Sequence, residues 1–227
     1  MLMASTYPLA AIPARLALEN KDWQRATNLE LQDIELNWEK FPWQEAIHHF
    51  AVAMGAANTN DFKTVKEKIE ILKNLHQNLI AQNDKTKAIP IKLVEIQIIT
   101  VQAWLNFRQN NLKGGLELMQ KAVEIERKTS KHPVTPGDVL PAIELLGDML
   151  LELDKPAEAL LVYEENLIDR PNRFNGIYGA AVAAEKSGDK EKAILYFNQL
   201  IELTKHANSN RSELEEAKQY IAEQQSI

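Results

Sequence analysis

The segment Leu140–Pro171, LPAIELLGDMLLELDKPAEALLVYEENLIDRP, sets the fold that we expect for the whole chain. Its apolar residues recur at three- and four-residue spacing in two runs, which predicts two helices joined by a tight turn. Pro171 ends the unit, because proline cannot continue a helix. The residues expected at the contact between the two helices are Ile143, Leu146, Gly147 and Leu150 on the first and Ala159 and Tyr163 on the second.

The order of these residues resembles the tetratricopeptide repeat signature, which reads W-x2-L-G-x2-Y, then A-x3-F, then P. The Leu-Gly, Ala, aromatic and Pro positions are met literally. Ile143 stands in the Trp position and Leu150 in the Tyr position. The resemblance implies an all-α fold built from antiparallel helix pairs.

A second unit follows at the same spacing. Gly147 and Ala181, Ala159 and Ala193, and Tyr163 and Phe197 are each 34 residues apart, which is the period of this repeat. Small residues let two antiparallel helices approach closely, and the aromatic residue then fills the space against the next unit. The spacing therefore predicts two consecutive regular repeats.

The earlier units follow the pattern loosely. Their small positions are taken by Ala103 and Gly115, by Ala53 and Val65, and by Ala14 and Ala26, and their large positions by Met119, Ile69 and Glu30. We expect a single domain over residues 1–227, an α-solenoid of about five antiparallel helix pairs. The expected units are 7–41, 42–82, 89–130, 138–171 and 172–205, with a C-terminal capping helix at 208–225. A generic helical bundle is the alternative.

Three segments resemble the C-terminal part of longer, uncharacterised bacterial tetratricopeptide proteins: FPWQEAIHHF, KHPVTPGDVLPAIELLGDMLLEL and PNRFNGIYGAA. That similarity implies further repeats upstream in the natural protein and carries no established activity. The abrupt start at the first helix agrees with a truncated N-terminus, because a natural first repeat usually has a polar capping face.

Composition excludes several classes of protein. The 26 Lys and Arg against 32 Asp and Glu give a net charge of −6, which argues against a general nucleic-acid binder. With no cysteine there is neither a disulfide nor a zinc–thiolate site. The longest apolar run, Ile89–Leu105, is interrupted by polar and charged residues, so we expect no membrane span. Arg15 follows the N-terminal apolar stretch, which is the wrong order for a signal peptide. The compartment stays unknown, with the cytoplasm favoured.

The resemblance also implies a concave groove lined by the first helix of each pair. The expected groove residues are Arg15, Met54, Trp104, Arg108, Glu144, Asp148, Asn175 and Tyr178. Such a mixed polar and aromatic surface suits an extended peptide or a helix. The carboxylate-clamp subclass needs Lys and Asn at set positions that are acidic or apolar here. We expect the acidic stretch of Glu144 and Asp148 to face Arg108, although each residue has ordinary solvated surface as its alternative.

Glu45, His49 and His76 are the weak candidates for a metal site. Glu45 and His49 are four residues apart and share a helix face, which is half of a metal site. Because His49 falls at a large packing position, a core histidine is the favoured interpretation, and we expect neither metal nor cofactor.

The function that this sequence predicts is a non-enzymatic scaffold for a protein or peptide partner. The chain has no nucleophile elbow, phosphate loop, dinucleotide fingerprint or metalloprotease motif. One alternative is an accessory or ligand- and metal-binding segment of a larger enzyme or sensory protein, with its site near Glu45, His49 and the proline-rich loop 130–137. A second alternative is a structural module that self-associates.

Overall fold

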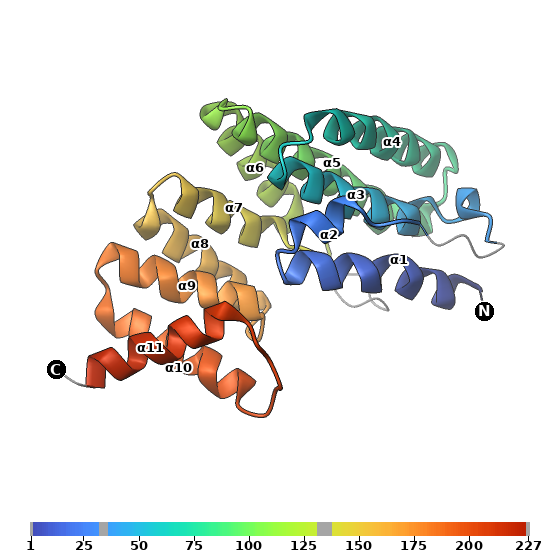
Figure 1. Cartoon of the computed structure of the whole chain (residues 1–227). Helices are drawn as coiled ribbons and strands as arrows, with labels where there is room; N and C mark the ends of the chain where they lie inside the picture. The colour runs from blue at the N-terminus through green and yellow to red at the C-terminus, as the bar shows by residue number, and fades with distance from the viewer. Residues whose placement is uncertain (1, 32–35, 131–137, 226–227) are drawn as a thin grey trace. The chain divides into compact units, whose positions relative to one another are not determined.

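A computed structural model describes residues 2–31, 36–130 and 138–225. These residues form α-helices and two short 3-10 helices, with no strand among them, which confirms the all-α class (Figure 1). The α-helices are α1 Leu2–Glu19, α2 Trp23–Thr27, α3 Pro42–Asn58, α4 Phe62–Ala81, α5 Ala88–Arg108, α6 Leu112–Arg127, α7 Ala142–Glu152, α8 Pro156–Asp169, α9 Phe174–Ser187, α10 Lys190–Thr204 and α11 Ser212–Gln225, and the 3-10 helices are η1 Trp38–Lys40 and η2 Lys85–Lys87. The chain divides into two compact units, Met1–Ala142 and Ile143–Ile227.

One turn geometry closes five consecutive helix pairs. The first turn residue has a positive φ each time: Lys21 (51°), Asn60 (62°), Asn110 (65°), Asp154 (57°) and Gly188 (83°). The amide of the next residue then donates back to a carbonyl five residues earlier, over 2.9–3.0 Å, as from Asp61 to Ala56 and from Asp189 to Ala184. This is the Schellman arrangement, which satisfies the carbonyls left over at a helix end. The helices are therefore packed in adjacent pairs by repeated local chemistry.

The same turns begin the second helix of each pair. Asp61 accepts from the backbone amide of Thr64 at 3.1 Å, and Asn111 accepts from that of Gly114 at 3.2 Å. Asp and Asn are good residues for this position, because their side-chain oxygens pair the first unbonded amides of a helix. The fourth pair differs, since Lys155-Pro156 starts α8 with a proline in the first turn.

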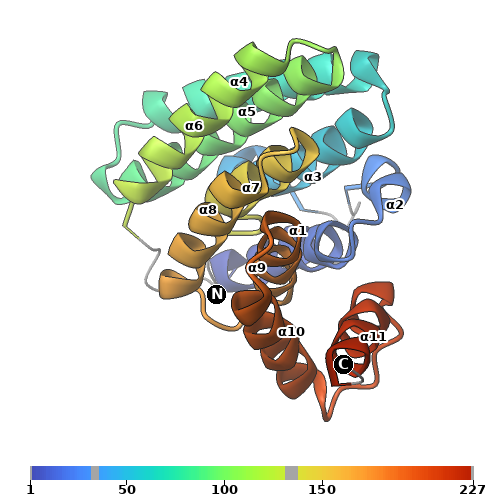
Figure 2. The same ribbon diagram turned by 90° about the vertical axis from the view of Figure 1, so that its left-hand side faces the viewer.

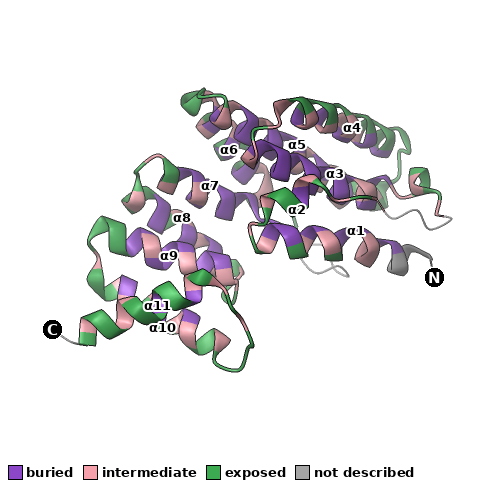
Figure 3. Ribbon diagram, viewed as in Figure 1, coloured by how far each residue is buried: buried purple, intermediate pink, exposed green. Residues whose placement is uncertain are grey.

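In the first unit the inner helices are α3 and α5. α3 packs on α1, α2, α4 and α5, and α5 packs on α3, α4 and α6. Fourteen of the 17 residues of α3 are buried, against five of the 20 residues of α4. In Figure 3 α3 is accordingly purple along its length, whereas α4 shows an exposed outer face. Inner helices are apolar all round and outer helices are amphipathic, as their positions require.

By composition and length, the segment Lys85–Arg108 is the one described helix that could cross a membrane. A buried core helix meets the same criterion. α5 packs on α3, α4 and α6, and eleven of its residues are buried. Of the apolar window that meets the criterion, 44% is buried inside the structure.

The second unit is organised around Tyr163 of α8. A Cβ atom added at Gly147 of α7 would lie 2.6 Å from the Tyr163 ring, and one added at Gly179 of α9 would lie closer still. The ring therefore fills the space between two glycines, and Gly179 lies on the next helix pair, as expected for an aromatic residue that packs against the next unit. One repeat later, Phe197 packs on the ring of Tyr220 in α11, with centroids 4.7 Å apart. α11 lies against α10 (Figures 1 and 2).

The first helix pair has irregular ends. α1 begins at Leu2 and carries Pro8 and Pro13 inside it. α2 is short and ends at Thr27. There the Thr27 hydroxyl donates to the carbonyl of Trp23 at 2.8 Å and the Asn28 amide to that of Gln24 at 2.9 Å. Such side-chain bonds compete with the helical ladder. Of the proline-rich loop, residues 131–137 lie outside the described residues.

Candidate functional site

The first unit holds a fixed guanidinium at the C-terminal end of α5. Arg108 lies over the rings of Trp104 and Phe107, at 4.8 and 5.6 Å from their centroids. Its terminal nitrogen donates to Asn58 Oδ1 at 2.6 Å. A cation is favoured at this end of a helix, because the last carbonyls carry partial negative charge. Cation–π contact and hydrogen bond together orient Arg108 before any partner arrives.

One and two turns before Arg108, α5 carries two residues whose polar side-chain atoms are buried in the core. Trp104 and Thr100 are 3% and 1% exposed. Within the described part of the chain, neither Trp104 Nε1 nor Thr100 Oγ1 has a hydrogen-bond partner. A buried donor without a partner costs about 1–3 kcal/mol, so the Nε1 atom of Trp104 lowers the stability of the folded chain. Met54, another expected groove residue, is fully buried in α3 and lies in the core.

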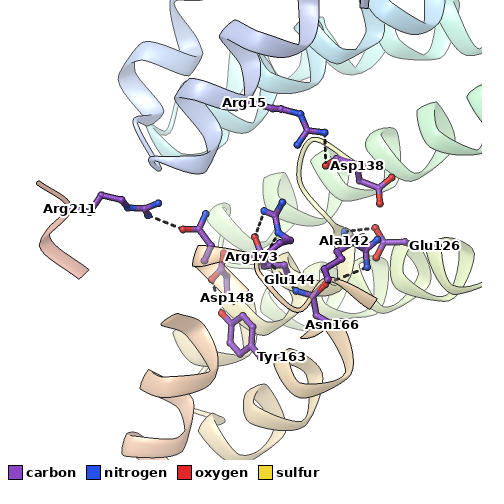
Figure 4. Close-up of polar contacts among 12 residues, drawn as sticks. Arg15, Glu126, Asp138, Ala142, Glu144, Asp148, Tyr163, Asn166, Arg173 and Arg211 are labelled. Atoms are coloured by element: carbon purple, nitrogen blue, oxygen red, sulfur yellow. Dashed lines mark hydrogen bonds and ion pairs between the residues drawn. The ribbon is translucent and has the colours of Figure 1, made fainter. Parts of the chain in front are cut away.

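Arg15 ties α1 to the segment that precedes α7 within the first unit. Its guanidinium donates to the backbone carbonyl of Asp138 at 3.1 Å (Figure 4). It also donates to the Tyr7 hydroxyl at 3.4 Å. The carboxylate of Glu126 accepts from the amide of Ala142 at 2.8 Å and fixes the same segment. Arg15 is therefore engaged in holding the fold together.

In the second unit, Glu144 is a buried structural carboxylate. It is 1% exposed, and both its oxygens accept from Arg173, at 2.7 and 2.8 Å (Figure 4). Asn166 of α8 donates to the same carboxylate at 3.4 Å. The expected exposed groove position is thus corrected: Glu144 pins α8 and the start of α9 onto α7. Sequence reasoning missed Arg173, because its partner lies 29 residues away.

Asp148 is likewise used inside the second unit. It accepts a hydrogen bond from the Tyr163 hydroxyl at 2.7 Å. Burial, and then the Asp148 carboxylate, hold the pKa of Tyr163 well above its ordinary value. The phenol therefore stays protonated and keeps donating, which fixes the ring between Gly147 and Gly179.

The last two expected groove residues contact the C-terminal helix segment. Asn175 Oδ1 accepts from Arg211 at 2.8 Å, and the Arg211 guanidinium lies 3.8 Å from the centroid of the Phe174 ring. The Tyr178 hydroxyl donates to Glu216 of α11 at 2.6 Å. Burial, reinforced by Glu216, raises the pKa of Tyr178. Chain elements of the protein itself thus occupy both positions.

The three weak metal candidates are not brought together. Glu45 and His49 pair with each other at 3.4 Å on α3, and His49 also meets His48 edge to face. His76 is on α4, and burial lowers its pKa. Over the described ranges, no group of three or more His, Cys, Asp or Glu side chains is placed to hold a metal ion. His49 is 8% exposed, in agreement with a core histidine.

No protein-family model matches the chain, and a search of curated proteins finds no match. Of the eight expected groove residues, Trp104 and Arg108 lie together on α5, where the half-buried Arg108 guanidinium covers the ring of the buried Trp104. Asn58, which the sequence did not indicate, accepts a hydrogen bond from the same guanidinium.

Proposed function

We propose that this chain is a tetratricopeptide-like α-solenoid that binds a protein or peptide partner and catalyses no reaction. The observation that carries the proposal is the set of five turns of one geometry. Repetition of one helix hairpin is the property that defines solenoid proteins. The wedge of Tyr163 between Gly147 and Gly179 adds the close packing that the repeat signature requires.

The proposed binding surface is the end of α5, around Arg108 and Asn58, with the buried Trp104 ring supporting Arg108 from below. Binding is cheaper when the groups that bind are already held in place, and Arg108 is held by two rings and one amide. An oriented guanidinium suits a carboxylate or a backbone carbonyl of a peptide. Arg is also among the residue types that most often dominate binding energy.

The acidic residues of α7 are a poorer choice for this surface. Glu144 and Asp148 have their partners inside the second unit, in Arg173 and Tyr163. To recruit either carboxylate, a ligand would have to break a buried ion pair or hydrogen bond. The proposed site is therefore assigned to α5 of the first unit.

A displayed library of random peptides tests the proposal. Peptides enriched on the immobilised full chain would be measured by fluorescence polarisation against Arg108→Gln and against Arg25→Gln, a matched change at an exposed arginine of α2. We expect Arg108→Gln to weaken binding at least tenfold and Arg25→Gln to leave it unchanged. A library with no enriched sequence, or equal loss in both variants, would contradict the proposal.

A further inference from the structure

The first unit contains an open groove formed by the two outer helices and one inner helix. Its volume is about 540 Å³. The groove is lined by Ile69, Leu105 and Leu118, which are apolar, and by Lys66, Glu70, Lys73, Gln102 and Asn106, which are polar. Ile69 and Leu105 are 5% and 9% exposed. A groove that combines apolar and polar lining residues is the kind of surface that takes one face of a helix.

The charged rim of this groove has a helical spacing. Lys66 and Lys73 are seven residues apart on α4, which places them about 10.5 Å apart along the helix axis. Glu70 lies between them and pairs with Lys73 at 2.7 Å. The rim therefore has one lysine in excess and favours an acidic occupant.

In the second unit, α8 carries a stripe of apolar and acidic side chains. Leu161 and Ile168 are 67% and 81% exposed, the two highest values for large hydrophobic side chains in the described part of the chain. They too are seven residues apart. The acidic residues that share this face are Glu158, Glu165 and Asp169. This apolar and acidic face is called the α8 stripe below.

The α8 stripe is not a general feature of the outer helices. The residue that lies 34 positions after Leu161 is Leu195 of α10, which is also exposed. The residue that lies 34 positions after Ile168 is Glu202. α10 therefore lacks the second apolar residue, and the full stripe occurs on α8 alone of these two equivalent helices.

We propose that the α8 stripe of one copy docks in the α4–α6 groove of a second copy of this chain. The two lysines of the groove are seven residues apart, and so are Leu161 and Ile168, and Glu158 and Glu165. One alignment of the two helices can therefore form the apolar contacts and the charged contacts together. The charge of the units supports the pairing: Met1–Ala142 has 17 Lys and Arg against 16 Asp and Glu, whereas Ile143–Ile227 has 9 against 16. Contact between two second units would be repulsive, and contact between a first and a second unit is attractive.

Because the two surfaces differ, the contact is head to tail. Such heterologous contacts continue from copy to copy until they close into a ring or extend as a chain. The contact is independent of the proposed peptide site, which lies at Arg108 and Asn58. Failure of either one leaves the other unaffected.

Light scattering of the full chain over a concentration series tests the docking. We expect the average mass to rise with concentration beyond that of one chain. The double change Leu161→Glu with Ile168→Glu should weaken association at least tenfold, whereas Leu195→Glu, an equivalent change on α10, should leave it unaltered. A single-chain mass at every concentration, or equal loss with Leu195→Glu, would overturn the proposal.

A charge exchange at the lysines of the groove and the glutamates of the α8 stripe gives a second, independent readout. Within one chain, Lys73 pairs with Glu70 and Glu158 pairs with Lys155. Lys66→Glu with Lys73→Glu, and Glu158→Lys with Glu165→Lys, should each weaken self-association at least tenfold. Mixed one to one, the two double variants should restore association, because each then supplies the surface the other needs. No recovery on mixing, with both variants folded by circular dichroism, would also overturn the proposal. If a foreign acidic helix bound the groove of a strictly single-chain protein, the groove would belong to that partner.

Discussion

Helices α5 and α7 use equivalent positions in opposite ways. Thr100 and Trp104 on α5 lie 44 residues before Glu144 and Asp148 on α7, with Ala103 and Gly147 as the matching small residues. On α5 both residues are buried, and the Trp104 ring lies under the Arg108 guanidinium at the helix end. On α7 the same positions hold carboxylates, which accept hydrogen bonds from Arg173 and from Tyr163. Equivalent positions of one fold therefore carry either an aromatic support for a cation or a carboxylate that joins neighbouring helices.

The largest effect on stability should come from breaking the buried ion pair between Glu144 and Arg173 in the second unit. Arg173→Ala leaves Glu144 buried without its cation, which should lower the free energy of unfolding by about 3–5 kcal/mol. Urea denaturation followed by circular dichroism measures the change. Replacing both partners, as Glu144→Leu with Arg173→Met, should recover most of the loss, since no charge is then left unpaired. A cost for Arg173→Ala below about 1 kcal/mol would contradict the buried pair.

Lowering the pH should destabilise the first unit, because His48 binds a proton more readily in the unfolded chain. Burial, then His49 and Lys68, lower the pKa of His48 to about 3 from an unfolded value of 6.5. Because the folded-state pKa is depressed, the folded chain binds fewer protons than the unfolded chain between these values. This stability is fully present above about pH 6.5 and is lost as the pH falls toward 3, by up to about 1.4 kcal/mol per pH unit.

Urea midpoints between pH 7 and pH 5.5 measure this dependence, above the range in which most carboxylates titrate. His48→Leu should flatten the slope. His206→Leu, at an exposed histidine after α10, is the matched control and should keep the slope of the unchanged chain. An equal slope in both variants would show that His48 is not the group responsible.

A smaller effect should follow from filling the space beside Tyr163. Gly147→Ala brings a methyl group to 2.6 Å from the ring, and overpacking of this kind costs about 1–3 kcal/mol. Thermal unfolding measures the loss. Equal stability of Gly147→Ala and the unchanged chain would show that the helices of the second unit can move apart.

The smallest effect should come from Trp104→Phe. This change keeps an aromatic ring under Arg108 and removes the buried Nε1 donor that has no partner in the described part of the chain. We expect the free energy of unfolding to change by less than about 1 kcal/mol, since losing an unpaired donor offsets the lost ring area. Trp104→Ala should cost about 3–5 kcal/mol by comparison. A large loss in Trp104→Phe would show that Nε1 does have a partner.

The helical class and most helix ends could be predicted from local sequence. Asp61, Asn111 and Asp189 mark helix starts because a cap depends on residues three positions away. The burial of Glu144 could not be predicted, since it depends on Arg173, which the fold brings across from the start of α9. The same holds for Asn58, whose link to Arg108 joins residues 50 positions apart. Periodicity identifies which positions face inward, and it carries no information about which polar pairs close there.

The five Schellman turns have a consequence for how such a chain tolerates insertions. Successive turn residues from Lys21 to Gly188 are 39, 50, 44 and 34 positions apart. Within every hairpin, however, the small position of the first helix comes seven residues before the turn residue, and the small position of the second helix comes five residues after it. Added residues therefore lie between hairpins, where doubling a flexible connection costs only about 0.6 kcal/mol. An insertion inside a hairpin would rotate one helix face away from its partner. The spacing of twelve residues between the two small positions of a hairpin is therefore constant along this chain, whereas the distance between successive hairpins varies.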